Sequence, residues 1–337
     1  MTAMIRAEAL QGFSALVSEL GGDAQRLLRR VHIDPAVQTR EESFFPHRQL
    51  VHLLENTAEE LACPDFGLRL AQRQDIGILG PIAVAARSCK TLGEALTLTG
   101  KFLFVHSPAL RFRMKLQKDR SSILLATDLL LERIPNCRQI DELAVGVMHR
   151  MIKTLSNQRY RPLEAQFAHT HCASPKVYRK FFDCAVRFDQ EVDGLLILVK
   201  DLEMPIHEHN PQLKAIATGY LESHFTSPFS ATAERVRAAV RRLLRVGAGS
   251  QQDVAAALLM HPRTLQRRLR DEQTSFDMIK DEVRKELAQR YLGQSLLPLS
   301  HITALLGYSE QSALTRSCQR WFGKPPRTLR AGLVRSL

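Results

Sequence analysis

Hydrophobic residues recur with a helical period in several segments of the first half of the chain. Between Pro46 and Leu61, and again between Leu92 and Leu103, apolar side chains return every three or four positions, which predicts one helix in each segment. The segment Arg138–Leu155 has the same period and is also predicted to be helical. The first twenty residues are amphipathic, with acidic residues inside the pattern and no continuous apolar stretch, and they predict a further helix.

Other segments of this region alternate with a period of two, which is typical of strands. Arg111–Gln117 alternates charged or polar side chains with apolar ones, and two serines separate it from the apolar run Ile123–Leu125, so the two segments are predicted to form a hairpin. Three more strands are predicted, at Glu164–Ala168, Val186–Asp189 and Leu195–Val199. Residues 1–205 are therefore predicted to form a mixed α+β domain, followed by a linker at 206–228.

The last hundred residues contain a repeated two-helix unit. One copy is Ser250–Glu272 and the other is Ser300–Phe322; a shift of 48 residues aligns their first helices, and a shift of 49 residues aligns Leu265 with Leu314 in their second helices. Each copy is predicted to be a helix-turn-helix. The segment 275–292 between them has apolar residues on one stripe, which predicts a connecting helix of about 27 Å. Residues 229–337 are thus predicted to be an all-α domain.

The ends of these helices carry capping signals. Ser250 and Asp253 have the spacing of a capping box at the start of the first copy. In the second copy, Gly307 suits the positive φ of a helix end, and Ser309 is predicted to cap the helix that follows the turn. These signals support the same two-helix boundaries as the repeat.

The second helix of each copy leaves a polar face free, because its apolar residues pack against the first helix. The donors and acceptors of Arg and Gln match guanine and adenine edges in the major groove. The residues predicted to contact DNA are Arg263, Gln266, Arg267 and Arg270 in the first copy, and Gln311, Ser312, Thr315 and Arg316 in the second. Helices held at the two ends of the connecting helix would enter successive major grooves, which lie about 34–36 Å apart.

Charge and composition agree with this prediction. The net charge of the chain is +12, and the part from Pro228 onward accounts for +10 of it, so the excess of basic residues lies in the helical region. A concentrated positive charge favours a polyanion partner. The hydrophobic content of 45% is enough for a folded core, and the uninterrupted apolar runs are far shorter than a membrane helix. The six cysteines are scattered without a CxxC pair, which favours reduced thiols and a cytoplasmic protein.

Two alternatives compete with a DNA-reading regulator. An enzyme or metalloprotein is suggested by two clusters of potential ligands, His169, His171 and Cys172, and His207, Glu208 and His209. No second Cys/His pair has structural-zinc spacing, and the chain lacks G-x-S-x-G, P-loop and G-x-G-x-x-G motifs, so we expect no metal, no cofactor and no catalysis. An architectural protein that binds DNA by charge alone is the second alternative. The Gln, Ser and Thr side chains of the second copy favour base readout instead.

The C-terminal segment resembles the DNA-binding domain of the AraC family of bacterial transcription regulators. The resemblance rests on HPRTLQRRL at 261–269, LGYSEQSALTR at 306–316 and G-x-x-P-x-x-L-R at 323–330. Upstream, LACPDFGLRLA at 61–71, GILGP at 77–81, TLGEAL at 91–96 and FVHSPAL at 104–110 are similar to the VirS-like branch, whose members carry an arabinose-binding-type effector domain.

This resemblance implies a regulator that contacts RNA polymerase, mostly to activate transcription, and that responds to a small molecule. It also implies pairing of effector domains into a homodimer. The residues at the family's base-contacting positions are Arg263, Gln266 and Arg267, and Gln311, Ser312, Thr315 and Arg316, while His261 replaces the family's usual Ser cap. The effector is not identified by the sequence: no spacing rule selects Lys101, His106, His149 or Tyr160 as its ligands.

Overall fold

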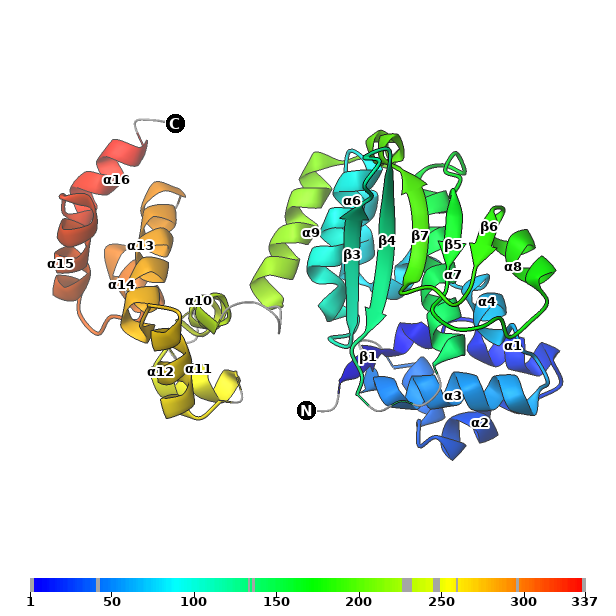
Figure 1. The fold of residues 1–337 in the computed structure, drawn as a ribbon. Coiled ribbons are helices and arrows are strands. Elements are labelled where there is room, and N and C mark those ends of the chain that lie inside the picture. Colours follow the sequence, from blue (N-terminus) through cyan, green and yellow to red (C-terminus); the bar gives the residue numbers. More distant parts are fainter. Residues whose placement is uncertain are drawn as a thin grey trace. The chain divides into compact units, whose positions relative to one another are not determined.

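The computed structural model describes residues 3–40, 43–132, 134, 137–225, 232–244, 249–258, 260–294 and 297–334. The chain divides into two compact units, Met1–Leu221 and Glu222–Leu337 (Figure 1). The division falls inside the segment expected to be a linker, but much of that segment is helix α9, Pro211–His224. This helix forms because Pro211 suits a first helical turn and the Asn210 side chain accepts a hydrogen bond from the backbone N–H of Leu213 at 2.9 Å.

The first unit is built on a five-stranded mixed sheet. The strand order is β3 (Leu110–Leu116), β4 (Ser122–Leu129), β7 (Asp193–Leu198), β5 (Glu164–Gln166) and β6 (Ala185–Arg187). Neighbouring strands are antiparallel except for the parallel pair β5–β6. The alternation in β3 points Phe112 and Met114 inward and exposes Arg111 and Arg113, which both form ion pairs with Asp128 of β4. One face of this sheet edge therefore meets solvent.

Helices supply the other half of the core of this unit. The helices are α1 (Phe13–Glu19), α2 (Ala24–Arg30), α3 (His47–Glu60), α4 (Phe66–Ala71), α5 (Pro81–Arg87), α6 (Leu92–Phe102), α7 (Arg138–Leu155) and α8 (Pro175–Phe182). The central helix α7 packs against α3 and α4 and against strands β4 and β7. The predicted helices of 46–61, 92–103 and 138–155, and the predicted hairpin, are confirmed to within a few residues.

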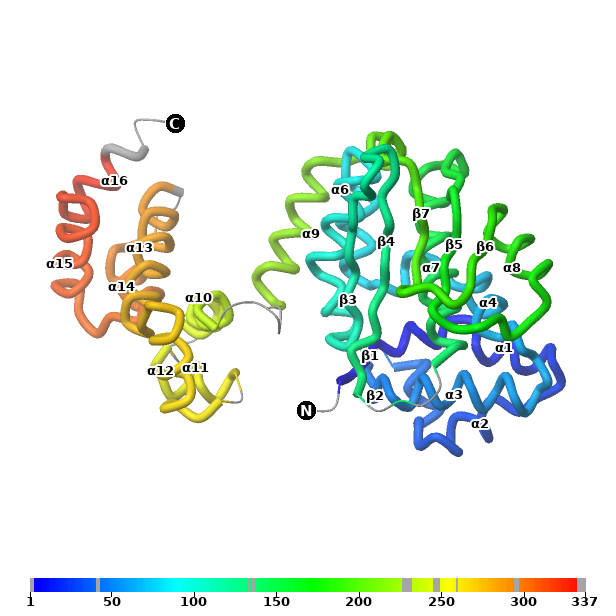
Figure 2. Tube along the Cα trace, viewed as in Figure 1, coloured from blue at the N-terminus to red at the C-terminus, as the bar shows by residue number. Residues whose placement is uncertain are grey.

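The N-terminus differs from the prediction of one helix over the first twenty residues. Met4–Arg6 is a strand, β1, which pairs with β2 (Phe44–Pro46) in a two-stranded sheet (Figure 2). Helix α1 begins only after Gly12, whose φ of 78° interrupts the helical path. The prediction was wrong because the pairing partner of Met4–Arg6 lies about forty residues away in the sequence, outside any local pattern.

The second unit consists of helices in its described residues. They are α10 (Thr232–Leu243), α11 (Gln251–Ala257), α12 (Pro262–Asp271), α13 (Phe276–Gln294), α14 (Leu299–Leu305), α15 (Gln311–Phe322) and α16 (Pro326–Val334). Their buried apolar side chains form one core, which includes Val240, Leu265, Val283, Leu287 and Leu314. No described helix of the chain is both long and apolar enough to cross a membrane.

Candidate DNA-binding surface and effector cavity

The first helix-turn-helix is formed by α11 and α12. The Ser250 hydroxyl accepts a hydrogen bond from the Asp253 backbone N–H at 3.1 Å, and the Asp253 carboxylate accepts one from the Ser250 backbone N–H at 2.9 Å, so the predicted capping box is present. At the start of α12, the His261 ring nitrogen Nδ1 accepts from the Arg263 backbone N–H at 3.3 Å. His261 therefore performs the capping role of the serine it replaces.

Helix α12 turns its apolar face inward and its basic face to solvent. Leu265 and Leu269 are buried in the core of the second unit. The four side chains predicted to contact DNA from this helix are all exposed: Arg263, Gln266, Arg267 and Arg270. The Gln266 amide also lies 3.3 Å from the Gln251 side-chain oxygen of α11, which orients it across the turn.

The second helix-turn-helix is formed by α14 and α15. Gly307 has a φ of 66° in the turn, as predicted. Glu310, not Ser309, is the N-cap of α15, and its side chain makes no capping hydrogen bond, so the prediction for Ser309 was wrong. The additional residue in this turn moves the helix start by one position. The Ser312 hydroxyl instead donates to the Glu310 carboxylate at 3.0 Å.

The predicted contact residues of α15 differ in accessibility. Gln311, Ser312 and Arg316 are exposed. Thr315 is half-buried, and its hydroxyl donates to the Gln311 carbonyl at 3.0 Å, which leaves its methyl group and one acceptor site for an outside partner. The α15 surface is therefore more neutral than the α12 surface and is rich in hydrogen-bonding groups.

Helix α13 holds the two motifs in one frame. Its nineteen residues span about 28 Å. From α13, the Arg284 guanidinium donates to the carbonyls of Leu306 and Gly307 at 2.9 and 2.7 Å and lies 4.1 Å from the ring centroid of Tyr308. This arginine satisfies the carbonyls at the C-terminal end of α14 and so fixes the turn of the second motif to α13.

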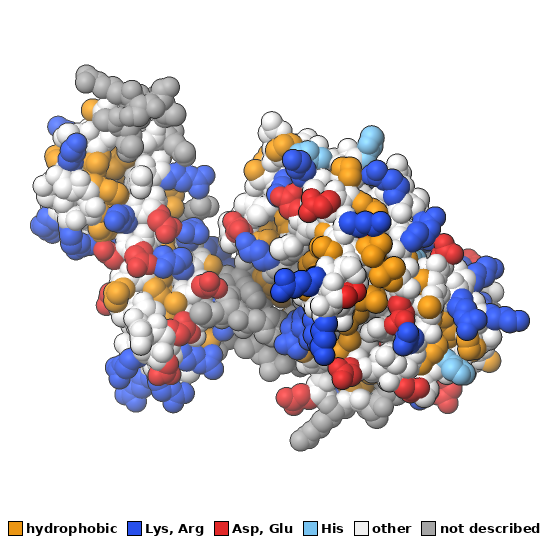
Figure 3. Space-filling model, turned by 45° about the horizontal axis from the view of Figure 1, so that its top comes forward, with side chains coloured by type: hydrophobic (Ala, Val, Ile, Leu, Met, Phe, Trp, Pro, Cys, Tyr) orange, Lys and Arg blue, Asp and Glu red, His pale blue; other side chains and the backbone are white. Residues whose placement is uncertain are grey.

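Two groups of arginines in the second unit differ in their contacts. The first group serves the scaffold: Arg237 and Arg241 of α10 pair with Glu282 and Glu286 of α13, and Arg320 pairs with Asp281. The second group forms no ion pair with any residue that the structure describes, and it consists of Arg263, Arg267, Arg270 and Arg316. Figure 3 shows Lys and Arg side chains gathered at the end of this unit where α11 and α12 lie. The two recognition helices thus present unpaired cations, although Arg242 of α10, Arg268 of α12, Arg290 of α13 and Arg327 of α16 are also exposed without an ion pair to a described residue.

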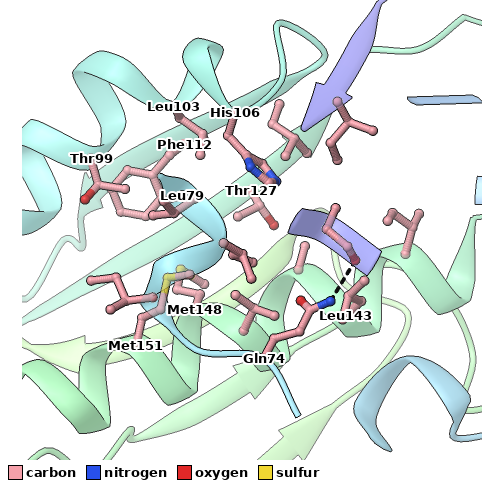
Figure 4. Close-up of a pocket in the computed structure, with 18 of the residues that line it drawn as sticks. Gln74, Leu79, Thr99, Leu103, His106, Phe112, Thr127, Leu143, Met148 and Met151 are labelled. Atoms are coloured by element: carbon pink, nitrogen blue, oxygen red, sulfur yellow. Dashed lines mark hydrogen bonds between the residues drawn. The ribbon is translucent and has the colours of Figure 1, made fainter. Parts of the chain in front are cut away.

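The first unit contains an apolar cavity of about 120 Å³ between the sheet and its helices (Figure 4). Residues of α6, β3, β4 and α7 line it, together with residues from the N-terminal helices. None of the lining side chains is Asp, Glu, Lys or Arg; the polar ones are His47, Gln74, Thr99, His106 and Thr127. An enclosed apolar space with few polar groups is the usual form of a small-molecule site.

The two histidines of the cavity are neutral and retain hydrogen-bonding capacity. Burial lowers the pKa of His47 to about 3 and that of His106 to about 4. His47 Nδ1 lies 2.8 Å from the Ser107 hydroxyl, whereas His47 Nε2 and His106 Nδ1 have no hydrogen-bond partner among the described residues. A ligand hydroxyl would suit both nitrogens, because it can donate to His106 Nδ1, the acceptor of a neutral ring whose other nitrogen bonds the Ile78 backbone, and can donate to or accept from His47 Nε2.

Comparisons with known proteins cover both units. A family model described as the arabinose-binding domain of AraC transcription regulators matches residues 21–206, and a helix-turn-helix domain model matches residues 254–332. The chain is also 42% identical over 328 residues to the HTH-type transcriptional regulator VirS of Mycobacterium tuberculosis, with 97% of this chain and 96% of VirS covered. The chain belongs to the AraC family of transcription regulators. The resemblance found in the sequence is confirmed, as is the α+β plus all-α fold class.

Two further proteins resemble this AraC-family regulator along most of its length. The Ornithine utilization regulator of Pseudomonas aeruginosa is 28% identical over 320 residues, which cover 92% of this chain and 91% of that protein. The crystal structure of the transcriptional regulator CdpR from Pseudomonas aeruginosa matches with a TM-score of 0.50 at 20% identity, covering 91% of this chain and 96% of CdpR, and so shares its fold. This chain is a DNA-binding, helix-turn-helix transcription regulator with an effector-binding domain.

The structure shows which of the four polar residues considered as effector ligands, Lys101, His106, His149 and Tyr160, reach the cavity. His106 lines the cavity, whereas His149 and Tyr160 are buried with their ring centroids 5.6 Å apart, and the Lys101 amine lies 4.9 Å from the Phe102 ring centroid. Sequence reasoning missed the cavity residues His47, Gln74, Thr99 and Thr127. They come from four separate segments, and no local pattern connects them.

Of the two clusters of potential metal ligands noted in the sequence, only the one at 169–172 contributes to a group of three in the described parts of the chain. His169 and Cys172 lie beside Glu142 of α7, which no sequence spacing had placed with them. His171 is exposed and contacts the Phe188 ring, with a centroid separation of 5.6 Å. His209 Nδ1 lies 3.0 Å from the Ser88 carbonyl, and in the described parts of the chain the segment 207–209 forms no group of three potential ligands.

Proposed function

We propose that this AraC-family protein is an effector-controlled transcription activator that reads two successive major grooves through α12 and α15. The observation that carries the proposal is that the second helix of both helix-turn-helix motifs exposes unpaired arginines, Arg263, Arg267 and Arg270 on α12 and Arg316 on α15, beside Gln and Ser side chains. Helix α13 is about 28 Å long, which is comparable to the separation of adjacent major-groove faces.

The proposed contact residues are those that the sequence suggested. Arg263, Gln266, Arg267 and Arg270 of α12, and Gln311, Ser312, Thr315 and Arg316 of α15, are assigned to DNA. Arg267 and Arg316 lie on exposed faces and have the donors for a guanine edge. The more neutral face of α15 suits hydrogen bonds to bases, because Gln and Ser can donate to and accept from base edges, whereas binding by charge alone would rest on cations.

The effector is assigned to the apolar cavity of the first unit. Its lining offers neutral imidazoles, an amide and hydroxyls but no side-chain charge, so the preferred effector is an uncharged, mostly apolar molecule with one hydrogen-bonding group. A cavity of about 120 Å³ is somewhat smaller than one of about 150 Å³ that holds benzene, so the effector has roughly the size of one ring. Its binding would shift the population towards the DNA-competent arrangement.

The remaining assignments concern assembly and partners. We place the protein in the cytoplasm with its DNA, without a catalytic role, and assign to it a contact with RNA polymerase and a homodimeric state. Leu213 and Ile216, exposed apolar residues on one side of α9, support a self-association surface. Analytical ultracentrifugation of the purified chain and of an Ile216→Glu variant tests the dimer: a monomeric wild-type protein would contradict it.

Footprinting of the purified protein on its own upstream intergenic DNA tests the central proposal. At physiological salt, protection of two adjacent major-groove faces that survives competitor DNA is expected. Arg267→Ala should weaken binding to that site by about 1–3 kcal/mol, while Arg241→Ala, which removes a scaffold arginine, should change it far less. Equal loss on a scrambled duplex would assign Arg267 to phosphate, and equal binding of wild type to both duplexes would favour the architectural alternative.

The effector class is tested by thermal denaturation with matched probes. We expect p-cresol, which is uncharged at neutral pH, to raise the melting temperature of the protein, whereas benzoate, of similar size but anionic, should not. A rise with benzoate alone would contradict the assignment, because the cavity lining has no cation to balance a carboxylate.

A further inference from the structure

Three side chains of different chemistry converge beside the N-terminal part of α7, and none of them lines the effector cavity. Glu142 projects from α7, and His169 and Cys172 belong to the segment between β5 and α8. One carboxylate oxygen, one ring nitrogen and the sulfur all lie within 4.8 Å of one another. We propose that Glu142, His169 and Cys172 form a binding site for a zinc-type divalent transition metal ion.

His169 is held in the tautomer that a metal ligand needs. Its Nδ1 lies 2.7 Å from the Thr170 carbonyl, and because a carbonyl only accepts, Nδ1 carries the proton. Nε2 is then an unprotonated acceptor, and it is buried without a hydrogen-bond partner among the described residues. Metal-binding histidines usually donate their other ring N–H in this way, which fixes the ring and raises its basicity.

Glu142 supplies a carboxylate with one oxygen satisfied and the other free. The residue is fully buried; Oε1 accepts a hydrogen bond from the Tyr178 hydroxyl at 2.5 Å, the Cys172 thiol interacts with the carboxyl group, and Oε2 has no partner by hydrogen-bond geometry within the described part of the chain. Burial raises the pKa of Glu142 to about 8, because a buried carboxylate is costly without a partner charge, and a bound cation would supply that partner. The carboxylates of Asp65 and Glu55 act on Glu142 as well, so the potential at this position is negative.

The mixture of ligand types selects the class of metal. Imidazole nitrogen, thiolate sulfur and carboxylate oxygen are the donors of zinc sites, whereas calcium and magnesium take oxygen ligands. Three protein ligands leave one position of a tetrahedron for water or a fourth donor. The Arg138 guanidinium also reaches the Cys172 sulfur, but Arg138 is exposed, so its long side chain can turn into solvent when a metal ion binds the thiolate and the thiol proton is released to water.

Metal binding would join two parts of the effector domain. It would fasten α7 to the segment 167–174, and α7 also lines the effector cavity with residues from Ile140 to Leu155. The site is independent of the proposed DNA contacts, because it lies entirely within the first unit.

Cobalt binding to the purified full-length protein, after removal of metals with EDTA, tests this site. Co²⁺ is a useful probe because coordination by a thiolate gives a sulfur-to-cobalt charge-transfer band, and tetrahedral coordination gives intense visible bands. Titration of the cobalt complex with Zn²⁺ then gives the zinc affinity. The variants are Cys172→Ser and His169→Gln, and the matched control is His171→Gln, which removes an exposed histidine from the same segment.

Wild type and His171→Gln should bind one ion per chain with the sulfur band. Cys172→Ser should lose that band, and zinc affinity should fall at least tenfold in both Cys172→Ser and His169→Gln, because even replacement of an outer-shell partner costs about 10–100-fold. Both variants keep the Glu142–Tyr178 hydrogen bond, so their circular dichroism should match wild type. Absence of the sulfur band in wild type, or unchanged zinc affinity in His169→Gln, would overturn the proposal.

Discussion

Replacement of His149 by Phe should reduce the acid sensitivity of the effector domain. His149 lies on α7 with an exposed fraction of 1%, and its ring centroid is 5.6 Å from that of Tyr160 and 5.3 Å from that of Phe182. Both ring nitrogens lack a hydrogen-bond partner among the described residues. Phe has nearly the same shape and fits an aromatic surrounding, so the substitution removes a titrating group and breaks no hydrogen bond.

The expected magnitude follows from the pKa of His149. Burial, together with the nearby charges of Lys153, Arg150 and Arg161, lowers that pKa from 6.5 to about 3. Below pH 6.5 the unfolded chain therefore binds a proton at His149 that the folded chain does not. The free energy of unfolding thus decreases as the pH is lowered from 6.5 to about 3. At about 1.36 kcal/mol per pH unit, His149 costs roughly 2 kcal/mol at pH 5.

Differential scanning calorimetry at pH 7 and pH 5 measures this effect. For a unit of this size, about 2 kcal/mol corresponds to about 4–8 °C, so the pH 7 to pH 5 difference in melting temperature should narrow by that amount in His149→Phe. His52→Phe, which replaces an exposed imidazole on α3, is the control. Its change in melting temperature between pH 7 and pH 5 should equal that of the wild type. An unchanged difference in His149→Phe would refute the account of His149 as a buried neutral ring.

Two further substitutions test the second unit. Arg316→Ala should weaken binding to the specific DNA site by about 1–3 kcal/mol in a gel-shift titration, and no change would mean that α12 binds without α15. Glu272→Gln should lower the stability of this unit by about 1 kcal/mol, because the Glu272 carboxylate caps α10 by accepting from the backbone N–H groups of Thr232 and Ala233 at 2.6 and 2.8 Å. Urea unfolding followed by the fluorescence of Trp321 measures the loss, and an unaltered midpoint would show that solvent replaces the cap.

The second unit was predictable because its signals are local. The repeat, the capping box at Ser250 and the turn glycine Gly307 each lie within one helix-turn-helix, so a short stretch of sequence contains both partners of each contact. The prediction that Ser309 caps α15 was wrong because the exact helix boundary is not marked by a local signal. One additional residue in the turn makes Glu310 the N-cap of α15, and the repeat alignment does not say on which side of the helix boundary that residue falls.

The effector domain was less predictable because its sites are tertiary. His47 and His106 meet in one cavity although 59 positions separate them, and Glu142 lies 27 positions before His169. Periodicity marks Glu142 only as a member of an amphipathic helix, and it cannot indicate which loop packs over that helix. The longer helices and the strands of the main sheet were therefore foreseen, whereas the β1–β2 pair and the residues that these elements bring together were not.

The division of the arginines in the second unit has a consequence for engineering. Since Arg237, Arg241 and Arg284 hold α10, α13 and the second turn together, the side chains of Arg263, Arg267 and Arg270 on α12 and Arg316 on α15 make no structural ion pair with the described residues. Those positions can be randomised as a library on an unchanged scaffold. A variant selected for a new operator would keep its effector domain, so the same chemical signal could be redirected to a different promoter.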